Sequence, residues 1–249
     1  MKRTHIVSLA IAFMSLVSIN VSGQELLDSL DMIVDQIIEG DVIQNVKTED
    51  KKVNDNGTQR ILVIGDSTLD GIGRRFNDYA SFNGHTIFTS IWYGATTKDW
   101  AYTTELDRLL KKVDPTFIVI SLGTNDLGYY DFKARAQAVQ EILRVIDGIP
   151  YIWIGPISLR SVADGSKIVN TIRETVGESN FFDSYHRKMV RFPDGIHPTF
   201  EASALWVDDV VKWMSRPEAS HHIRLKTPPK SVPFKNYETH RCGYKGRKK

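Results

Sequence analysis

Four short segments of the chain contain the residue types that nucleophilic catalysis requires. They are residues 65–68 (Gly-Asp-Ser-Thr), Gly94, residues 123–126 (Gly-Thr-Asn-Asp) and residues 194–197 (Asp-Gly-Ile-His). Each follows an apolar run that is typical of a buried strand. Because parallel strands end at a common edge of their sheet, the fold could bring all four segments together. The pattern predicts a serine hydrolase.

Ser67 and His197 are the expected nucleophile and base. A serine hydroxyl is a weak nucleophile until a neighbouring base removes its proton, and a turn that opens into a helix gives it a partly positive environment. The His197 imidazole could take that proton and return it to the leaving group, while Asp194 could orient the ring. Taken singly, these residues also fit an ordinary helix cap and an ordinary turn.

Gly94 and Asn125 are the expected oxyanion donors. Acyl transfer develops a negative oxygen, which needs preorganised hydrogen-bond donors. Gly94 can offer a backbone N–H, Asn125 its side-chain amide, and Ser67 a second backbone N–H. The adjacent Asp66 and Asp126 are expected to hold the loops in place rather than to take part in the chemistry.

These segments need a framework of strands and helices, and the hydrophobic pattern supplies one. Short runs rich in β-branched and aromatic residues predict strands at 61–64, 86–91, 117–122 and 151–154, with a weaker fifth near 180–182. Helical spacing is found at 72–82, 98–112, 132–146, 167–176 and 200–214. Alternating strands and helices predict right-handed crossovers and a central parallel sheet, hence a three-layer α/β/α sandwich.

The first 59 residues are expected to lie outside this domain. Basic residues at the start, an apolar stretch too short to span a bilayer and small residues up to Gly23 predict a signal peptide over 1–23. Residues 24–59 are expected to form an amphipathic helix and a linker. The mature protein is therefore predicted to be periplasmic or secreted, without stable membrane insertion after cleavage.

The predicted catalytic domain spans 60–215, and a basic tail follows over 216–249. From Pro217 to Lys249 the tail contains nine Lys or Arg residues against two Glu, although the net charge of the whole chain is only +2. Its prolines and few apolar residues predict a flexible, solvated segment, either solubilising or able to bind an anionic envelope polymer. Nucleic acid is a poor match for an exported protein. The single cysteine, Cys242, excludes an internal disulfide.

In this order and spacing, the four segments resemble the sequence blocks of the SGNH hydrolase superfamily, the GDSL-type esterases and lipases. The resemblance covers residues 60–214 and implies a flavodoxin-like sandwich and a reaction through an acyl-enzyme without a cofactor. It also implies the roles of nucleophile for Ser67, oxyanion donors for Ser67, Gly94 and Asn125, and remaining triad members for Asp194 and His197. Thr68 stands where the lipase-like branch usually has leucine, and no residue spacing indicates a metal site.

Aromatic residues near the expected oxyanion donors point to a substrate class. Trp92, Tyr93, Tyr129 and Tyr130 could stack on sugar rings, which favours short acyl groups, such as acetyl, on a glycan. Any of them could instead be a core residue. Arg74, Arg75 and Arg160 are candidates to meet an anionic substrate group, or are simply solvated.

Three other functions fit the same residues. An O-acyltransferase acting on an envelope glycan would use the same triad, and a lipase or thioesterase of the GDSL type would differ only in its ester. A non-catalytic glycan-binding protein could keep the fold without turnover.

Overall fold

The computed structural model describes residues 57–221 and 223–241 of the chain. The expected signal peptide, the amphipathic helix and most of the linker, as well as Cys242, lie outside the described residues. Within the described part of the chain, no helix is both long enough and apolar enough to cross a membrane.

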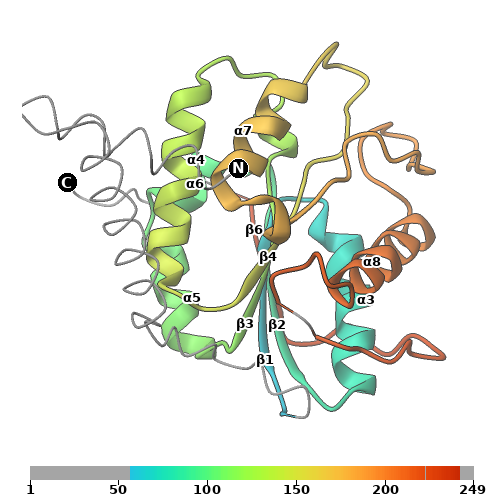
Figure 1. Cartoon of the computed structure of the whole chain (residues 1–249). Helices are drawn as coiled ribbons and strands as arrows, with labels where there is room; N and C mark the ends of the chain where they lie inside the picture. Colours follow the sequence, from blue (N-terminus) through green and yellow to red (C-terminus); the bar gives the residue numbers. More distant parts are fainter. Residues whose placement is uncertain (1–56, 222, 242–249) are drawn as a thin grey trace, which may run out of the picture. The chain divides into compact units, whose positions relative to one another are not determined.

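A parallel sheet of six strands forms the centre of the described structure (Figure 1). The strands are β1 (Arg60–Gly65), β2 (Thr86–Trp92), β3 (Phe117–Ser121), β4 (Tyr151–Ile154), β5 (Phe181–Phe182) and β6 (Tyr237–His240). Their spatial order is β5-β4-β3-β1-β2-β6, and every neighbouring pair is parallel. The strand order reverses beside β1, so the segments after β1, β2 and β3 lie next to one another at the carboxyl edge.

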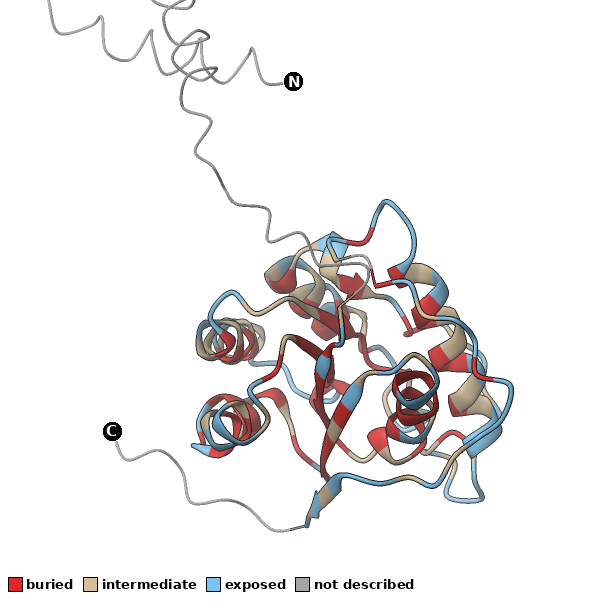
Figure 2. Ribbon diagram, turned by 90° about the horizontal axis from the view of Figure 1, so that it is seen from below, coloured by how far each residue is buried: buried red, intermediate tan, exposed pale blue. Residues whose placement is uncertain are grey.

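Helices cover both faces of this sheet. They are α3 (Leu69–Phe82), α4 (Thr97–Ala101), α5 (Glu105–Val113), α6 (Phe132–Ile146), α7 (Ser166–Val176) and α8 (Phe200–Met214), with short 3₁₀ turns η1 (Thr124–Asp126) and η2 (Glu178–Asn180). Side chains alternate along β1, so that Leu62 and Ile64 face the core under α4–α7, and Ile61 and Val63 face the core under α3 and α8. The burial colours in Figure 2 follow this arrangement, with the sheet and the inward sides of the helices buried. The predicted three-layer α/β/α sandwich is confirmed.

The predicted helix over 98–112 is two helices instead of one. Thr96 and Asp99 form a capping box that begins α4, and the chain then turns through residues 102–104 before α5 starts. In that turn the Thr103 hydroxyl accepts a hydrogen bond from the Glu105 backbone N–H. Threonines compete with the helix for backbone hydrogen bonds, which explains why the run is interrupted there.

The segment after α8 differs from the predicted solvated tail. Ala219 and Ile223 are buried, Phe234 packs against the core under α3 and α8, and β6 pairs with β2. The expectation of a flexible segment is therefore wrong for this part of the tail, and the domain continues past residue 215. The polar, basic composition of the tail did not predict that it packs on the domain. A few apolar side chains and an open strand edge are enough to dock a short segment.

Candidate active site

Ser67 lies in the turn that joins β1 to α3. The turn is fixed by Asp66, whose Oδ1 accepts hydrogen bonds from the Thr68 backbone N–H at 2.9 Å and the Thr68 hydroxyl at 2.7 Å. The Asp66 backbone N–H also donates to the Ser121 carbonyl of β3 at 3.2 Å. Ser67 itself is half-buried at the start of a 14-residue helix. These contacts hold the Ser67 hydroxyl close to the N-terminus of α3, where the helix dipole favours negative charge.

His197 joins Ser67 to Asp194 through both of its ring nitrogens. Nε2 lies 2.8 Å from Ser67 Oγ, and Nδ1 lies 2.7 Å from Asp194 Oδ2. In the tautomer with the proton on Nδ1, the ring donates to the carboxylate and accepts from the serine hydroxyl. This is the order of nucleophile, base and orienting acid that serine hydrolysis requires.

The loop before α8 keeps Asp194 and His197 in this relation. Asp194 Oδ1 accepts from the backbone N–H groups of Ile196 at 2.8 Å and His197 at 2.9 Å. The Phe192 N–H donates to the His197 carbonyl at 2.8 Å, which closes the loop on itself. Hydrogen bonds from the His197 ring and from the two backbone groups lower the pKa of Asp194 to about 2, so the carboxylate is ionised at neutral pH.

The expected oxyanion donors follow β2 and β3. Gly94 has a φ of +77°, and a Cβ at this position would meet nothing within 4 Å, so the backbone conformation rather than space favours glycine. The Asn125 amide donates to the Ala95 carbonyl at 2.9 Å and ties the two segments together. Among the described residues, the backbone N–H groups of Ser67 and Gly94 donate to no protein acceptor. They are available for a substrate oxygen.

Asp126 holds a loop, as the sequence predicts. Its carboxylate accepts from the Thr97 backbone N–H at 3.0 Å, the Thr97 hydroxyl at 2.8 Å and the Arg135 guanidinium at 2.6 Å. These contacts connect the segment after β3 to α4 and α6. Asp126 is fully buried and directly follows Asn125, so the network fixes the backbone of the expected amide donor.

Asp66 also holds its loop, but its carboxyl group is incompletely satisfied. It is fully buried, and Oδ2 has no hydrogen-bond partner among the residues that the structure describes. Burial raises the pKa of Asp66 to about 6, against the hydrogen bonds from Thr68 that oppose the shift.

A cavity of about 210 Å³ opens beside Ser67. It is lined by Ser67, Thr68, Asp70, Gly71, Tyr93, Phe192, Asp194, His197, Pro198 and Phe200. Phe192 and Phe200 are partly exposed and pack edge to face, with ring centroids 5.4 Å apart. Tyr93 lies near Asp70, and burial together with that carboxylate raises the pKa of Tyr93. The cavity therefore combines aromatic surface with polar groups.

Of the four aromatic residues proposed to contact substrate, only Tyr93 lines this cavity. Trp92 is 4% exposed and packs edge to face with Trp100 in the core, so the prediction that it meets a sugar is wrong. Tyr129 and Tyr130 are exposed, at 49% and 86%, but do not line the cavity. Loop position alone could not predict which way each ring would turn.

Phe192, Phe200 and Asp70 were missed by the sequence analysis. The signal that could have found the two phenylalanines is their position, since they flank the Asp194–His197 segment at distances of two and three residues. Asp70 lies one helical turn after Ser67 on α3, and helical spacing places it near the same face.

The three candidate arginines occupy different environments. Arg74 lies over the Phe200 ring, with the guanidinium carbon 4.7 Å from the centroid, and is therefore close to the cavity. Arg75 is committed to Asp208 at 2.8 Å and Asp78 at 3.4 Å, which makes it a structural residue. Arg160 is exposed and does not line the cavity.

Comparisons with known proteins support the fold. No family model and no curated protein sequence matches the chain. The esterase EstA from Pseudoalteromonas sp., solved with the inhibitor monoethylphosphonate, is similar with a TM-score of 0.51 and 16% identity, over 63% of this chain and 100% of that one. An acetyl xylan esterase, AlAXEase, has a TM-score of 0.49 at 17% identity, over 60% of this chain and 97% of that one. The likeness to EstA supports the fold expected from the resemblance to the SGNH hydrolases.

Proposed function

We propose that this chain is a serine esterase of the SGNH hydrolase superfamily that cleaves carboxylic esters through Ser67, His197 and Asp194. The observation that carries the proposal is the continuous contact from Ser67 Oγ to His197 Nε2 at 2.8 Å and from His197 Nδ1 to Asp194 Oδ2 at 2.7 Å. The two residues that this contact joins, Ser67 and His197, are 130 positions apart in the sequence, and both line the same cavity.

In the acylation step, Ser67 Oγ attacks the ester carbonyl while His197 Nε2 takes the hydroxyl proton. The carbonyl oxygen becomes negative and is stabilised by the N–H groups of Ser67 and Gly94 and by the Asn125 amide. The bond to the alcohol then breaks, and His197 gives its proton to the leaving oxygen. The product is an acyl-serine and a free alcohol.

In the second step, water replaces the alcohol. His197 removes a proton from the water, whose oxygen attacks the acyl carbon, and the same donors stabilise the negative oxygen. The bond to Ser67 breaks, the serine oxygen regains the proton from His197, and the carboxylic acid leaves. Asp194 stays ionised throughout and stabilises the imidazolium.

The proposed substrate is a short acyl ester, such as an acetyl group, on a glycan. The small cavity favours a short acyl group, and the partly exposed rings of Phe192 and Phe200 could stack on a sugar. Asp70 and Tyr93 offer polar atoms to sugar hydroxyls. Export to the periplasm or the medium, inferred from the first 23 residues, fits such a substrate.

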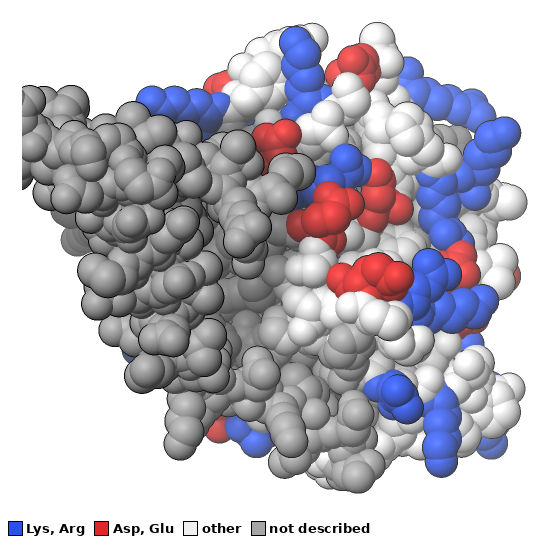
Figure 3. Space-filling model, in the orientation of Figure 1, with Lys and Arg blue, Asp and Glu red and all other residues white. Residues whose placement is uncertain are grey.

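Binding of the basic C-terminal segment to an anionic envelope polymer is a further part of the proposal. It is supported by the sequence, which gathers nine Lys or Arg residues after residue 216. On the described part of the face seen in Figure 3, acidic side chains gather near the centre and basic side chains lie mainly along the right-hand side.

The proposal is tested by hydrolysis of p-nitrophenyl acetate and p-nitrophenyl octanoate. The matched variants are Ser67→Ala and Ser81→Ala, the latter on the exposed side of α3. We expect the wild type and Ser81→Ala to cleave acetate, and Ser67→Ala to lose about 10⁴–10⁶-fold in kcat. Turnover that survives in Ser67→Ala would refute the assigned nucleophile, and a preference for octanoate would favour the lipase alternative.

Acetylated glycans then separate the remaining alternatives. An esterase releases free acetate, whereas an acyltransferase makes more acylated glycan than acid when an acceptor is present. Tight binding without turnover, unchanged by Ser67→Ala, would favour the non-catalytic glycan-binding alternative.

A further inference from the structure

The C-terminal strand β6 lies against β2, and β2 leads directly into the expected oxyanion segment. The parallel register pairs Thr89 with Tyr237 and Trp92 with His240. One residue beyond β2, the Tyr93 backbone N–H donates to the His240 carbonyl at 2.9 Å. Gly94 follows immediately. The last described strand therefore fixes the backbone just before the proposed oxyanion donor.

Arg241 extends this contact to a side chain of the cavity. Its guanidinium carbon lies 4.6 Å from the centroid of the Tyr93 ring, and Tyr93 lines the cavity beside Ser67. A guanidinium over an aromatic face is attracted by the ring quadrupole. Arg241 thus supports one wall of the cavity from outside.

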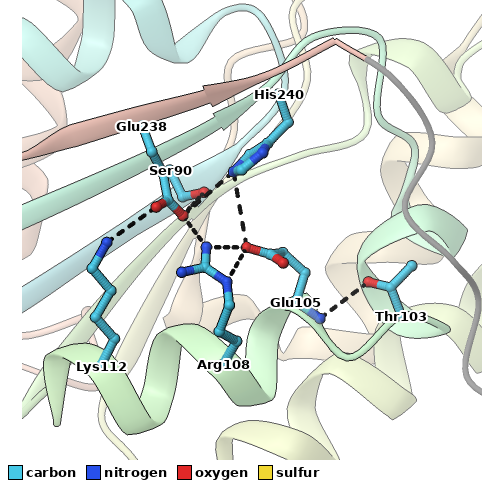
Figure 4. Close-up of polar contacts among 7 residues, drawn as sticks. All are labelled: Ser90, Thr103, Glu105, Arg108, Lys112, Glu238 and His240. Atoms are coloured by element: carbon cyan, nitrogen blue, oxygen red, sulfur yellow. Dashed lines mark hydrogen bonds and ion pairs between the residues drawn. The ribbon is translucent and has the colours of Figure 1, made fainter.

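Charged side chains of α5 hold β6 in place (Figure 4). Glu238 accepts hydrogen bonds from Arg108, from Lys112 Nζ at 3.1 Å and from the Ser90 hydroxyl at 3.2 Å. Arg108 also donates through Nε to the buried Glu105 at 2.7 Å. The Arg108 guanidinium lies between the two carboxylates, and Lys112 supplies a second positive charge to Glu238, so burial of Glu105 is compensated by a direct ion pair.

His240 completes this cluster from the end of β6. Its Nε2 lies 3.3 Å from Glu238 Oε1 and 3.8 Å from Glu105 Oε1. Atoms of Glu105, Glu238 and His240 that could ligate a metal lie within 4.8 Å of one another. Because Arg108 already donates to both carboxylates, the cluster is best described as an ion-paired junction between α5 and β6.

We infer that β6 positions the oxyanion segment, and that Glu238 and Arg241 are positioning residues for the active site. The inference rests on the proposed function, since it concerns the Gly94 donor. If β6 loosens, the Tyr93 backbone loses its partner and the Gly94 N–H is less well aimed at the developing negative oxygen. A donor that acts mainly in the transition state affects kcat more than KM.

The inference is tested with Arg241→Ala, Arg241→Lys and Glu238→Gln in the full chain. Glu178→Gln is the matched control, because the Glu178 side chain is 84% exposed and contacts Arg173 at the surface. Two quantities are measured: kcat and KM for p-nitrophenyl acetate, and the amide hydrogen exchange of a peptide that contains residues 93–95.

We expect Arg241→Ala and Glu238→Gln to lower kcat about tenfold, less than the 10²–10³-fold typical of deleting a donor, with KM unchanged. Exchange over 93–95 becomes faster in both. Arg241→Lys, which keeps a cation, and Glu178→Gln stay close to the wild type. Unchanged kcat and unchanged exchange in Arg241→Ala and Glu238→Gln would overturn the inference. A raised KM with normal kcat in Arg241→Ala would also overturn it, because Arg241 would then be a substrate contact.

Two provisions keep this result separate from the proposed function. If Glu238→Gln fails to fold, the exposed Arg241 variants decide the question. Amide exchange can be measured without turnover. A wild type without Ser67-dependent activity would refute the esterase proposal. Faster exchange over residues 93–95 in Arg241→Ala would still support the control of this segment by β6. Unchanged exchange would overturn that control.

Discussion

At the scale of single residues, the proposed mechanism gives Asn125 two tasks that draw on the same amide. One N–H donates to the Ala95 carbonyl and joins the segments after β2 and β3, and the second N–H is left for the substrate oxygen. Asn125→Ala is expected to lower kcat about 10²–10³-fold with little change in stability. Steady-state kinetics with urea unfolding checks this. Loss of stability at normal kcat would make Asn125 a loop-holding residue only.

In the proposed mechanism Asp194 acts through His197, and we expect it to be less critical than Ser67. Asp194→Asn keeps an oxygen for the backbone N–H groups of Ile196 and His197 but loses the charge that stabilises the imidazolium. We expect a smaller loss of kcat than for Ser67→Ala, measured with p-nitrophenyl acetate at pH 7. An equal or larger loss would indicate that the charge is essential to ring orientation.

Asp66 is expected to destabilise the fold as it ionises. It titrates near 3.8 in an unfolded chain, whereas burial raises the pKa of the folded group to about 6. Between these two pH values the folded state binds more protons than the unfolded chain. The free energy of unfolding therefore falls by about 3 kcal/mol as pH rises from about 4 to about 6. Asp66→Asn should remove this dependence.

The Asp66 prediction is measured by urea unfolding of both proteins at pH 4 and pH 8. The matched control is Asp147→Asn, at an exposed carboxyl on the end of α6. An identical pH dependence in the wild type and Asp66→Asn would show that folding does not raise the pKa of Asp66.

At the scale of elements, the crossing of α3 and α8 depends on a glycine. A Cβ at Gly71 would lie 2.2 Å from Ser203 Oγ and 2.5 Å from Ser203 Cβ. Gly71→Ala therefore should destabilise the protein by about 1–3 kcal/mol, although alanine has the higher helix propensity. Urea unfolding is the measurement, with Gly128→Ala, where a Cβ meets nothing within 4 Å, as the control. Rescue by Ser203→Gly would confirm the cause.

Hydrophobic periodicity was a good guide to most elements. The helices α6, α7 and α8 and the strands of the sheet centre lie within a residue or so of the predicted ranges, because each buries a regularly spaced apolar face. The break between α4 and α5 was not predicted. There the apolar spacing runs on, while the Thr103 hydroxyl accepts a hydrogen bond from the Glu105 backbone N–H and the helix is interrupted.

At the scale of the whole molecule, the segment after α8 belongs to the domain. Ile223 is 5% exposed, and Phe234 packs against the same core. A chain that ends at Ser215 is expected to be less stable than one that ends at Arg241, by about 2 kcal/mol or more from the buried apolar area alone. Comparison of the urea midpoints of the two chains is the test. Equal midpoints would restore the prediction of an independent tail.

The sequence by itself determined the α/β/α class and the identity of the residues that meet at Ser67, because alternating apolar periods require a parallel sheet and parallel strands end at one edge. Only the tertiary structure decided that Trp92 turns into the core, that Phe192 and Phe200 line the cavity, and that the basic segment adds a sixth strand. Those features depend on contacts between segments far apart in the chain. Local periodicity carries no information on which distant partner a ring or a strand edge will meet.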